Sequence, residues 1–257
     1  MKPATLERAR RALAGRYLVA LTGAGMSVES GIPPFRGEGG LWSRFDPLVD
    51  GHVRTLDTDP ERSWRLFREL AGPIARARPH RGHAALARAE RAGRLLGVIT
   101  TNVDGLHQRA GSNNVAEVHG SARRIVCHGC GRHASPDLVL GSDGVPRCPE
   151  CGGVLRPDVV LFGETLPDEA WRLAMELVAD AEGLVTIGTS LEVQPAAGLP
   201  LLIRRRGLPV VEIGPEPSDM ARQELSLWLE GSAATLVPPL LAPARGRLGR
   251  WLFGAGR

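Results

Sequence analysis

The four cysteines of this chain form two C-x2-C pairs, Cys127 with Cys130 and Cys148 with Cys151. The separation of the two pairs falls in the range of roughly 15–20 residues that is typical of a structural Zn²⁺ site. Glycine or proline lies within or beside each pair, which suits the tight turns that bring two thiolates onto one ion. Because four thiolates complete a tetrahedral shell, we expect a structural zinc and expect catalysis to lie elsewhere.

Two other uses of these cysteines have to be weighed. Two disulfides would suit a secreted protein, but Met1 and Lys2 are not followed by an apolar secretory segment, and 257 residues can bury a core without such bridges. A redox site would need one C-x2-C motif, whereas the sequence has two. No apolar run approaches the roughly 20 residues of a membrane span. We therefore predict a cytoplasmic zinc protein with no membrane partner.

Arginine supplies nearly all of the positive charge, because Lys2 is the only lysine. The formal net charge is +4 at pH 7, and the pI is about 9.3. The arginines are interspersed with acidic residues, so the composition favours an arginine-rich coding background over a nucleic-acid partner. The arginine-rich end, residues 243–257, is expected to be a solvated basic tail. Composition leaves the oligomeric state open.

Short apolar runs, each bounded by glycine, proline or charged residues, predict central strands of a parallel sheet that is covered on both faces. They occupy residues 18–21, 95–100, 184–187, 210–213 and 235–237. Helical stretches before or between them cover residues 6–13, 83–92 and 169–181. This alternation predicts an α/β fold with a doubly wound, Rossmann-like parallel sheet.

Two segments interrupt the alternation. Residues 38–81 are rich in tryptophan, proline and arginine and predict a helical insert with loops. Residues 119–157 hold the four cysteines with little helical periodicity and predict an inserted zinc ribbon. The sheet domain is therefore expected to be discontinuous, with the two inserts forming a small domain beside it. Its expected parts are residues 1–37, 82–118 and 158–242.

A glycine-rich loop, residues 23–27, directly follows the first predicted strand. Such a loop lets backbone N–H groups approach a phosphate at the end of a strand. The third glycine of the usual G-x-G-x-x-G fingerprint is Val28 here, so the loop alone is a weak indication of nucleotide binding. A second loop of small residues, 188–190, follows another predicted strand. Open α/β sheets bind ligands at the carboxyl ends of their strands, where we expect both loops to lie.

Five blocks of sequence resemble, in order, the motifs of the sirtuin family of NAD-dependent protein lysine deacylases, in its bacterial form. The first two are G-A-G-M-S-V-E-S-G-I-P-P-F-R-G and T-T-N-V-D-G-L-H-Q-R-A-G. A histidine–glycine pair, P-D-V-V-L-F-G-E and G-T-S-L-E-V-Q-P follow. The blocks occupy residues 23–37, 100–111, 119–120, 157–164 and 188–195, and the resemblance as a whole covers roughly residues 5–240.

The resemblance implies that NAD and Zn²⁺ are bound and that the substrate is an acylated lysine in a protein or peptide. The implied products are nicotinamide, O-acyl-ADP-ribose and free lysine, with acetyl as the first expected acyl group. The acyl oxygen attacks the ribose carbon that bears nicotinamide, and the 2′-hydroxyl then attacks the resulting imidate. One general base of near-neutral pKa is needed, and His119 is the expected base, whereas His107 and His83 are expected to be structural.

Further catalytic and cofactor roles are carried over residue by residue. Asn102 is expected to hold the ribose or a water, and Asp104 to accept from the nicotinamide amide. Asp104 could alternatively cap the helix that carries Leu106. Phe35 is expected to shield the ribose carbon from water. The residues that the resemblance places at the cofactor are Gly23, Ala24, Gly25, Ser27, Phe35, Arg36, Thr101, Asn102, Asp104, Gly188, Thr189, Ser190 and Gly214.

Four residues are expected to contact the acyl-lysine substrate. Val160 and Phe162 would line the channel, where a backbone edge suits the addition of an extended peptide. Phe67 and Leu70 stand where sirtuins that favour succinyl or malonyl groups resemble one another in a tyrosine and an arginine. We therefore predict an apolar pocket without a carboxylate clamp, unless Arg68 turns into it.

Two positions depart from the family pattern. Thr101 replaces a glutamine near the nicotinamide ribose, and Gly214 replaces an asparagine that contacts the adenosine ribose; both changes predict weaker NAD binding. The alternative enzymes on this fold are a mono-ADP-ribosyltransferase and an NAD glycohydrolase, although His119 favours deacylation. Outside enzymes, the chain could be an NAD-sensing module whose ribbon and arginines contact nucleic acid.

Overall fold

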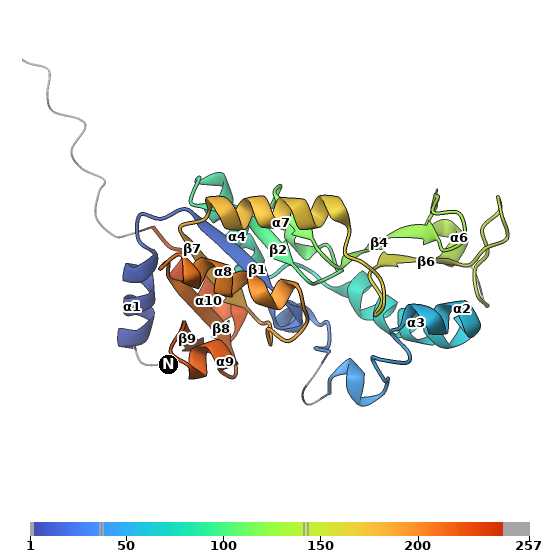
Figure 1. Ribbon diagram of the computed structural model, residues 1–257, viewed down its shortest axis with the longest axis horizontal. Helices are drawn as coiled ribbons and strands as arrows, with labels where there is room; N and C mark the ends of the chain where they lie inside the picture. The colour runs from blue at the N-terminus through green and yellow to red at the C-terminus, as the bar shows by residue number, and fades with distance from the viewer. Residues whose placement is uncertain (1–2, 36, 38, 141, 143, 244–257) are drawn as a thin grey trace, which may run out of the picture.

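A computed structural model of the chain describes residues 3–35, 37, 39–140, 142 and 144–243. These residues form a six-stranded sheet and, toward the other end of an elongated molecule, a three-stranded sheet (Figure 1). The helices of the 38–81 segment lie beside the smaller sheet (Figure 1). The predicted class, a Rossmann-like α/β sheet with a small second module, is confirmed.

All strands of the larger sheet run parallel, in the order β3-β2-β1-β7-β8-β9. The order reverses at β1, because β2 and β3 lie on one side of β1, whereas β7, β8 and β9 lie on the other side. Open α/β sheets bind ligands beyond the strand ends at such a reversal. The strands are β1 (Leu18–Thr22), β2 (Leu95–Thr100), β3 (Val115–Glu117), β7 (Gly183–Ile187), β8 (Val210–Gly214) and β9 (Leu227–Glu230).

Helices cover both faces of this sheet. Leu18 and Ala20 of β1 join one hydrophobic cluster and Val19 and Leu21 the other, because side chains alternate along a strand. With both faces buried, the central strands carry unbroken apolar runs, which made them predictable. One face is covered by α1 (Pro3–Leu13), α4 (Arg81–Arg91) and α10 (Ala233–Leu240), and the other by α7 (Asp168–Asp180) and α8 (Leu199–Arg205).

One predicted strand is wrong. Residues 235–237 lie in α10, whose first turn is capped by Ser232: its hydroxyl accepts from the Thr235 N–H at 3.3 Å. Three apolar residues show no period that separates a strand from a helix, and the capping serine favours the helix. The sixth strand is instead β9, in which Trp228 pairs with Glu212 of β8. β3 and β9 form the edges of the sheet, and such short edge strands carry too little apolar sequence to be predicted.

The small module joins the antiparallel sheet to the helical insert. Trp64 donates from Nε1 to the Leu155 carbonyl at 3.0 Å. The same side chain packs with Leu56, Phe67 and Leu161 in one apolar cluster, so the two inserted segments share a core. The module contains β4 (Gly120–Cys127), β5 (His133–Ala134), β6 (Leu155–Val159), α2 (Val53–Thr58), α3 (Pro60–Arg76) and α6 (Asp137–Leu140).

The remaining elements are short. They are the 3₁₀ helices η1 (Ala24–Met26), η2 (Val28–Ser30), η3 (Leu41–Ser43) and η4 (Ala196–Gly198) and the helices α5 (Leu106–Arg109) and α9 (Asp219–Arg222). Among the residues that the structure describes, no helix combines the length and the apolar character needed to cross a membrane.

Candidate active site and zinc site

The four cysteines gather at the end of β4. The Sγ atoms of Cys127, Cys130, Cys148 and Cys151 all lie within 4.8 Å of one another, which suits ligation of one ion. A Cβ atom at Gly153 would come within 3.1 Å of Cys127 Sγ, so glycine keeps space beside the cluster. Four thiolate donors fit Zn²⁺ and leave no position open for a substrate, as a structural site requires.

Two glycine turns meet where the strand order reverses. The Gly23 N–H donates to the Ile187 carbonyl at 3.0 Å, and the Gly25 N–H donates to the Gly188 carbonyl at 2.8 Å. A Cβ atom at Gly25 would lie 2.7 Å from Gly188 Cα, so the two backbones are in contact. Gly188 has a φ of +60°, which favours glycine. The loops after β1 and β7 are thereby fixed to each other, as the sequence predicts for one ligand site.

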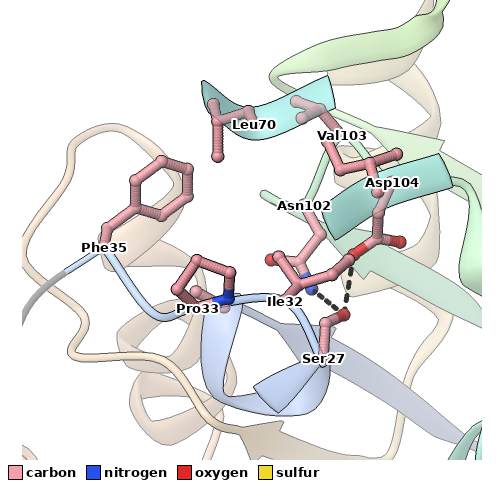
Figure 2. Close-up of a pocket in the computed structure, with 10 residues that line it drawn as sticks. Ser27, Ile32, Pro33, Phe35, Leu70, Asn102, Val103 and Asp104 are labelled. Carbon is pink, nitrogen blue, oxygen red and sulfur yellow. Dashed lines mark hydrogen bonds between the residues drawn. The ribbon is translucent and has the colours of Figure 1, made fainter. Parts of the chain in front are cut away.

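Ser27, Asn102 and Asp104 form a hydrogen-bonded group on the wall of a pocket (Figure 2). Ser27 Oγ donates to Asp104 Oδ2 at 2.7 Å, and Asn102 Nδ2 donates to Ser27 Oγ at 3.2 Å. The same Asn102 nitrogen donates to the Gly23 carbonyl at 2.9 Å. The amide nitrogen is thus used within the protein, and no described residue donates to Asn102 Oδ1.

Asp104 also bonds to the start of helix α5. Its Oδ1 accepts from the Leu106 N–H at 2.8 Å, so the alternative role that the sequence offers, at the helix start, is seen as a bond from the residue before the N-cap, Gly105. Burial raises the pKa of the Asp104 carboxyl, and the hydrogen bonds from Ser27 and Leu106 and the charge of Arg109 lower it in part. Each carboxylate oxygen has a second lone pair, so a ligand amide can also donate to this group.

His119 lies at the junction of β3 and β4, within reach of both modules. Its imidazole hydrogen-bonds the backbone of Thr101, the residue before Asn102. Its own carbonyl accepts from the Val160 N–H at 2.9 Å. Burial lowers the pKa of His119, and the bond to Thr101 raises it in part. The ring is therefore neutral at pH 7, with one nitrogen held and the other able to take a proton, as a general base requires.

The pocket lies between the glycine loop, the end of β2 and α3 (Figure 2). On one side the Phe35 ring stacks on Trp42, with centroids 5.2 Å apart and an interplanar angle of 25°. Leu70 of α3 faces it across the pocket (Figure 2). The sequence predicts the lining residues Ala24, Ser27, Phe35, Leu70, Asn102 and Asp104, and it misses Ile32, Pro33, Ile74 and Val103. Ile32, Pro33 and Val103 lie inside the sequence motifs, and Ile74 lies one helical turn after Leu70. These positions are the signal from which the four residues could have been predicted.

Phe67 and Leu70 lie nearly one turn apart on α3 but have different surroundings. Phe67 is 5% exposed and packs edge-on against Trp64, with ring centroids 5.5 Å apart. It shares its apolar cluster with Leu161. Leu70, nearly one turn later, lines the pocket together with Asn102. The two residues expected at the acyl group thus connect the pocket wall to the core of the small module.

Arg68 does not turn toward this pocket. Its guanidinium donates to Glu61 at 3.1 Å and to the Gly144 carbonyl at 2.6 Å. It also lies over the Trp64 ring, 5.7 Å from the centroid. Arg68 therefore supplies no clamp for an acidic acyl group in this arrangement.

The segment that contains Val160 and Phe162 has its backbone donors in use. The Val160 N–H is bound to His119, and the Phe162 N–H donates to the Gly51 carbonyl at 2.9 Å. Between them, the Leu161 N–H donates to Glu164 at 2.8 Å. An extended peptide that is added here has to pair with backbone groups other than these three donors.

The two departures from the family pattern lie at strand ends. The Thr101 hydroxyl donates to the Thr22 carbonyl at 3.3 Å and is therefore used within the protein. Gly214 ends β8, and its carbonyl accepts from Trp228 Nε1 at 3.2 Å. A Cβ atom at Gly214 would meet only the Glu216 carbonyl oxygen, at 3.6 Å, so the position has room for a side chain.

The second loop places its hydroxyl groups beside the glycine contact. Thr189 Oγ1 accepts from the Leu191 N–H at 3.3 Å, and Ser190 is exposed. Arg36, expected at the phosphates or ribose, lies outside the described residues, as does the tail beyond residue 243.

His83 and His107 lie in the core and do not line the pocket. Their rings are 5.0 Å apart between centroids. Burial lowers the pKa of His83 to about 2, with a further contribution from its histidine neighbours. Burial likewise lowers the pKa of His107 to about 3. Both rings are neutral at pH 7, in agreement with the structural roles expected for them.

Comparisons with known proteins identify the family to which the chain belongs. The sequence model of the Sir2 family matches residues 23–195. The chain is 45% identical over 233 residues to NAD-dependent protein deacylase 2 of Pyrobaculum aerophilum, covering 91% of this chain and 93% of that protein. It is 43% identical over 230 residues to NAD-dependent protein deacylase 1 of Archaeoglobus fulgidus, covering 90% and 94%.

Solved structures give the same result. A complex of a Sir2 homologue with NAD aligns at a TM-score of 0.84 and 40% identity, covering 91% of this chain and 92% of that chain. A Sir2 complex with a p53 peptide and NAD⁺ aligns at a TM-score of 0.81 and 33% identity, covering 90% and 95%. Sequence and fold agree along most of the chain, and the protein belongs to the Sir2 family, the sirtuins.

Proposed function

We propose that the protein is an NAD-dependent protein lysine deacylase, acting first of all on acetyl-lysine. The observation that carries this proposal is the neutral, half-buried His119 beside Thr101 at the strand end that also presents Asn102 and Asp104. Relatives of this chain are named NAD-dependent protein deacylase or deacetylase. The products are nicotinamide, O-acyl-ADP-ribose and free lysine.

NAD is a cosubstrate in this reaction and supplies a ribose carbon whose nicotinamide leaves more readily than an amine leaves an amide. The glycine turns at Gly23 and Gly188 hold the dinucleotide at the reversal of strand order. Phe35, stacked on Trp42, covers the pocket and excludes water from the ribose. Thr189 and Ser190 face the phosphate side.

Two polar residues orient the cosubstrate. Asn102, anchored through its amide nitrogen, presents Oδ1 to a ribose hydroxyl or a water. Asp104 accepts from the nicotinamide amide with the lone pairs that Ser27 and Leu106 leave free. Both residues are buried, so their positions are set before the ligand binds.

His119 takes the proton of the ribose hydroxyl that attacks the acyl carbon. Its lowered pKa keeps the ring unprotonated at neutral pH, and the bond to Thr101 holds its orientation. General-base catalysis of this kind contributes about 10²–10⁴-fold to a rate. An enzyme that only cleaves NAD would not need this base for attack on an acyl carbon. The presence of His119 therefore favours a deacylase over such an enzyme.

The substrate is an acylated lysine in an extended peptide. A Sir2 structure holds a p53 peptide together with NAD⁺, which supports a peptide substrate here. Leu70 makes the acyl end apolar, Phe67 packs in the core of the small module, and Val160 and Phe162 line the channel. Zn²⁺ at the four cysteines stabilises the small module that carries part of this surface. Free thiolates for zinc suit a reducing compartment, so we place the protein in the cytoplasm.

Incubation of the protein with an acetylated peptide, with and without NAD, tests the proposal. Mass spectrometry of the peptide and release of nicotinamide are followed together, and we expect equal amounts of deacetylated peptide and nicotinamide. Nicotinamide without peptide deacetylation would instead identify an NAD glycohydrolase. Transfer of ADP-ribose onto protein would identify the mono-ADP-ribosyltransferase alternative, and NAD binding without turnover an NAD-sensing module.

A further inference from the structure

A chain of buried hydroxyl and imidazole groups lies directly behind the pocket. Thr22 and Thr100 end the neighbouring strands β1 and β2 and are partners in the register of these strands. Both are buried, at 0% and 2% exposure, and Thr22 Oγ1 donates to Thr100 Oγ1 at 2.8 Å. Buried hydroxyl groups need such partners, so this pair fixes the relative position of the two strand ends.

One end of this hydrogen-bonded chain of side chains reaches the active site. Thr100 Oγ1 also accepts from the backbone N–H of Asn102 at 3.1 Å. Asn102 is held from the other side by its bond to the Gly23 carbonyl. The backbone and the side chain of Asn102 are thus each anchored, and the free Oδ1 is directed by both anchors.

The other end is His107, which is 1% exposed and whose Nε2 lies 2.9 Å from Thr22 Oγ1. A hydroxyl has one proton, which in the direction from Thr22 to Thr100 is given to Thr100. In this arrangement His107 Nε2 carries the ring proton and donates it to Thr22. Burial keeps the ring neutral, with a pKa of about 3, so the same tautomer persists across the neutral range.

His83 of helix α4 lies beside His107, with 5.0 Å between the ring centroids. The backbone N–H of His80 donates to His83 Nδ1 at 3.4 Å, so the proton of the neutral His83 ring lies on Nε2. His83 Nε2 and His107 Nδ1 are both buried and have no partner within the described part of the protein. No hydrogen bond joins the two rings among the described residues, so the hydrogen-bonded chain ends at His107.

We propose that His107, Thr22 and Thr100 are positioning residues for the reaction, because together they hold the backbone of Asn102 in the orientation that catalysis uses. None of the three lines the pocket, so they act through Asn102 and not on the substrate. The inference rests on the proposed deacylase function and on the role proposed for Asn102. A chain that served stability alone would not need to end on a pocket residue.

The test is the substitution Thr100→Val, which keeps the shape of the side chain and removes the hydroxyl that Asn102 donates to. We expect kcat for an acetylated peptide to fall about tenfold or more, since small errors in position are costly to a rate. The KM for the peptide should stay within about twofold, because the residue does not contact the peptide. Thr100→Ser restores the hydroxyl and should recover most of kcat.

Thr186→Val is the matched control. Thr186 is 2% exposed on β7, the neighbour of β1 on its other side, and takes no part in the hydrogen-bonded chain. Thermal unfolding of both variants shows whether they lose similar stability. Equal kcat values for Thr100→Val and Thr186→Val, or no rescue by serine, would reduce the chain to a structural role and overturn the proposal.

A second measurement is independent of activity. ¹⁵N NMR of the histidine rings should show His107 protonated at Nε2 in the folded protein, and Thr22→Val should shift that signal. Protonation at Nδ1 instead would overturn this placement of the protons, because Thr100 would then donate to Thr22 and Thr22 to His107. Should the unmodified protein fail to deacetylate any peptide while the Nε2 tautomer is found, the proposed function would fall and the hydrogen-bonded chain would stand. If Thr100→Val does not fold, Thr22→Val carries the same kinetic test.

Discussion

The two ends of the molecule are held together by different forces. At the carboxyl end of the parallel sheet, buried polar groups bond to one another, as in the Ser27, Asn102 and Asp104 group. The small module is held together instead by an apolar cluster around Trp64 and by the separate group of four cysteines. Hydrogen bonds fix the direction of individual atoms, whereas apolar contacts fix mainly volume. Substitutions at the sheet end should therefore change rates, and substitutions in the module should change stability or acyl choice.

His119 lies where the parallel sheet and the small module meet. Its ring is bound to Thr101 on the sheet side, and its carbonyl is bound to Val160 on the module side. The proposed general base is thus placed by the sheet, while its backbone is bonded to the segment proposed to line the substrate channel. Under the proposed function, this double attachment would let the inserted module present acyl-lysine to groups that the sheet positions.

The largest effect is expected from the zinc site. Cys148→Ser should release the metal and unfold the small module, because structural zinc contributes on the order of 10 kcal/mol of binding free energy to small domains. Metal analysis and circular dichroism would follow both changes. Glu150→Gln is the matched control, because Glu150 lies between Cys148 and Cys151 in the sequence. This substitution removes only an exposed ion pair with Arg132, so the variant should keep its zinc. Much less than one zinc per unmodified chain would contradict the assignment.

The next effect tests the sheet side. His119→Ala should lower the rate of deacetylation by roughly 10²-fold or more, the scale of a lost general base, while NAD binding and folding are retained. NAD affinity by calorimetry and turnover of an acetylated peptide separate these properties. His133→Ala, an exposed histidine on β5, is the matched control and should be fully active. Near-normal turnover of the His119 variant would move the base elsewhere.

A third prediction tests the module side through its acyl pocket. A succinyl carboxylate would be buried beside Leu70 with no cation among the pocket residues that the structure describes, since Arg68 is bound to Glu61 and Gly144. Burial of an unpaired carboxylate costs several kcal/mol, and acetyl carries no such charge. An acetylated peptide should therefore have a kcat/KM about 10²-fold or more above that of its succinylated counterpart, each ~1.4 kcal/mol being tenfold. Equal efficiencies would show that an arginine reaches the pocket.

The sequence predicts the fold class, the cluster of four cysteines and most pocket residues for two physical reasons. Strands buried on both faces, such as β1 and β2, leave unbroken apolar runs, and the chemistry of the site is carried by short local motifs. The hydrogen-bonded chain behind the pocket could not be predicted in this way. Its members Thr22 and Thr100 are 78 residues apart, and Thr22 and His107 are 85 apart, so they meet only once the strands pair. α10 was mistaken for a strand because only its cap distinguishes it locally.

The buried histidines predict a pH dependence of stability. The pKa of His83 falls to about 2 and that of His107 to about 3 in the folded state, below the ordinary value near 6.5. Stability is therefore fully present above pH 6.5 and is lost as the pH falls toward the folded values, because the unfolded chain binds the extra protons. Each histidine should remove about 1.4 kcal/mol of unfolding free energy per pH unit below 6.5.

Urea unfolding between pH 8 and pH 5 measures this slope. His83→Gln, although less stable, should have a shallower slope, because one of the three histidines with a lowered pKa, His83, His107 and His119, is gone. An unchanged slope in that variant would assign the acid sensitivity to other groups, such as the zinc thiolates.

The smallest effect concerns the adenosine end of the sheet. From the family resemblance, Gly214 is expected to stand where the family pattern has an asparagine, and an added Cβ there meets only the Glu216 carbonyl oxygen, at 3.6 Å. Gly214→Asn should therefore fit and supply one hydrogen bond to the ribose, worth about 0.5–1.5 kcal/mol, or roughly two- to tenfold in affinity. We expect the KM for NAD to fall by that factor with kcat unchanged, because the adenosine is remote from the reacting carbon. Gly144→Asn, in an open surface position of the small module, is the matched control and should leave the KM for NAD as it is. An unchanged or higher KM in Gly214→Asn would mean that the ribose does not reach β8, and that this chain binds the adenosine end of NAD through other residues than its relatives do.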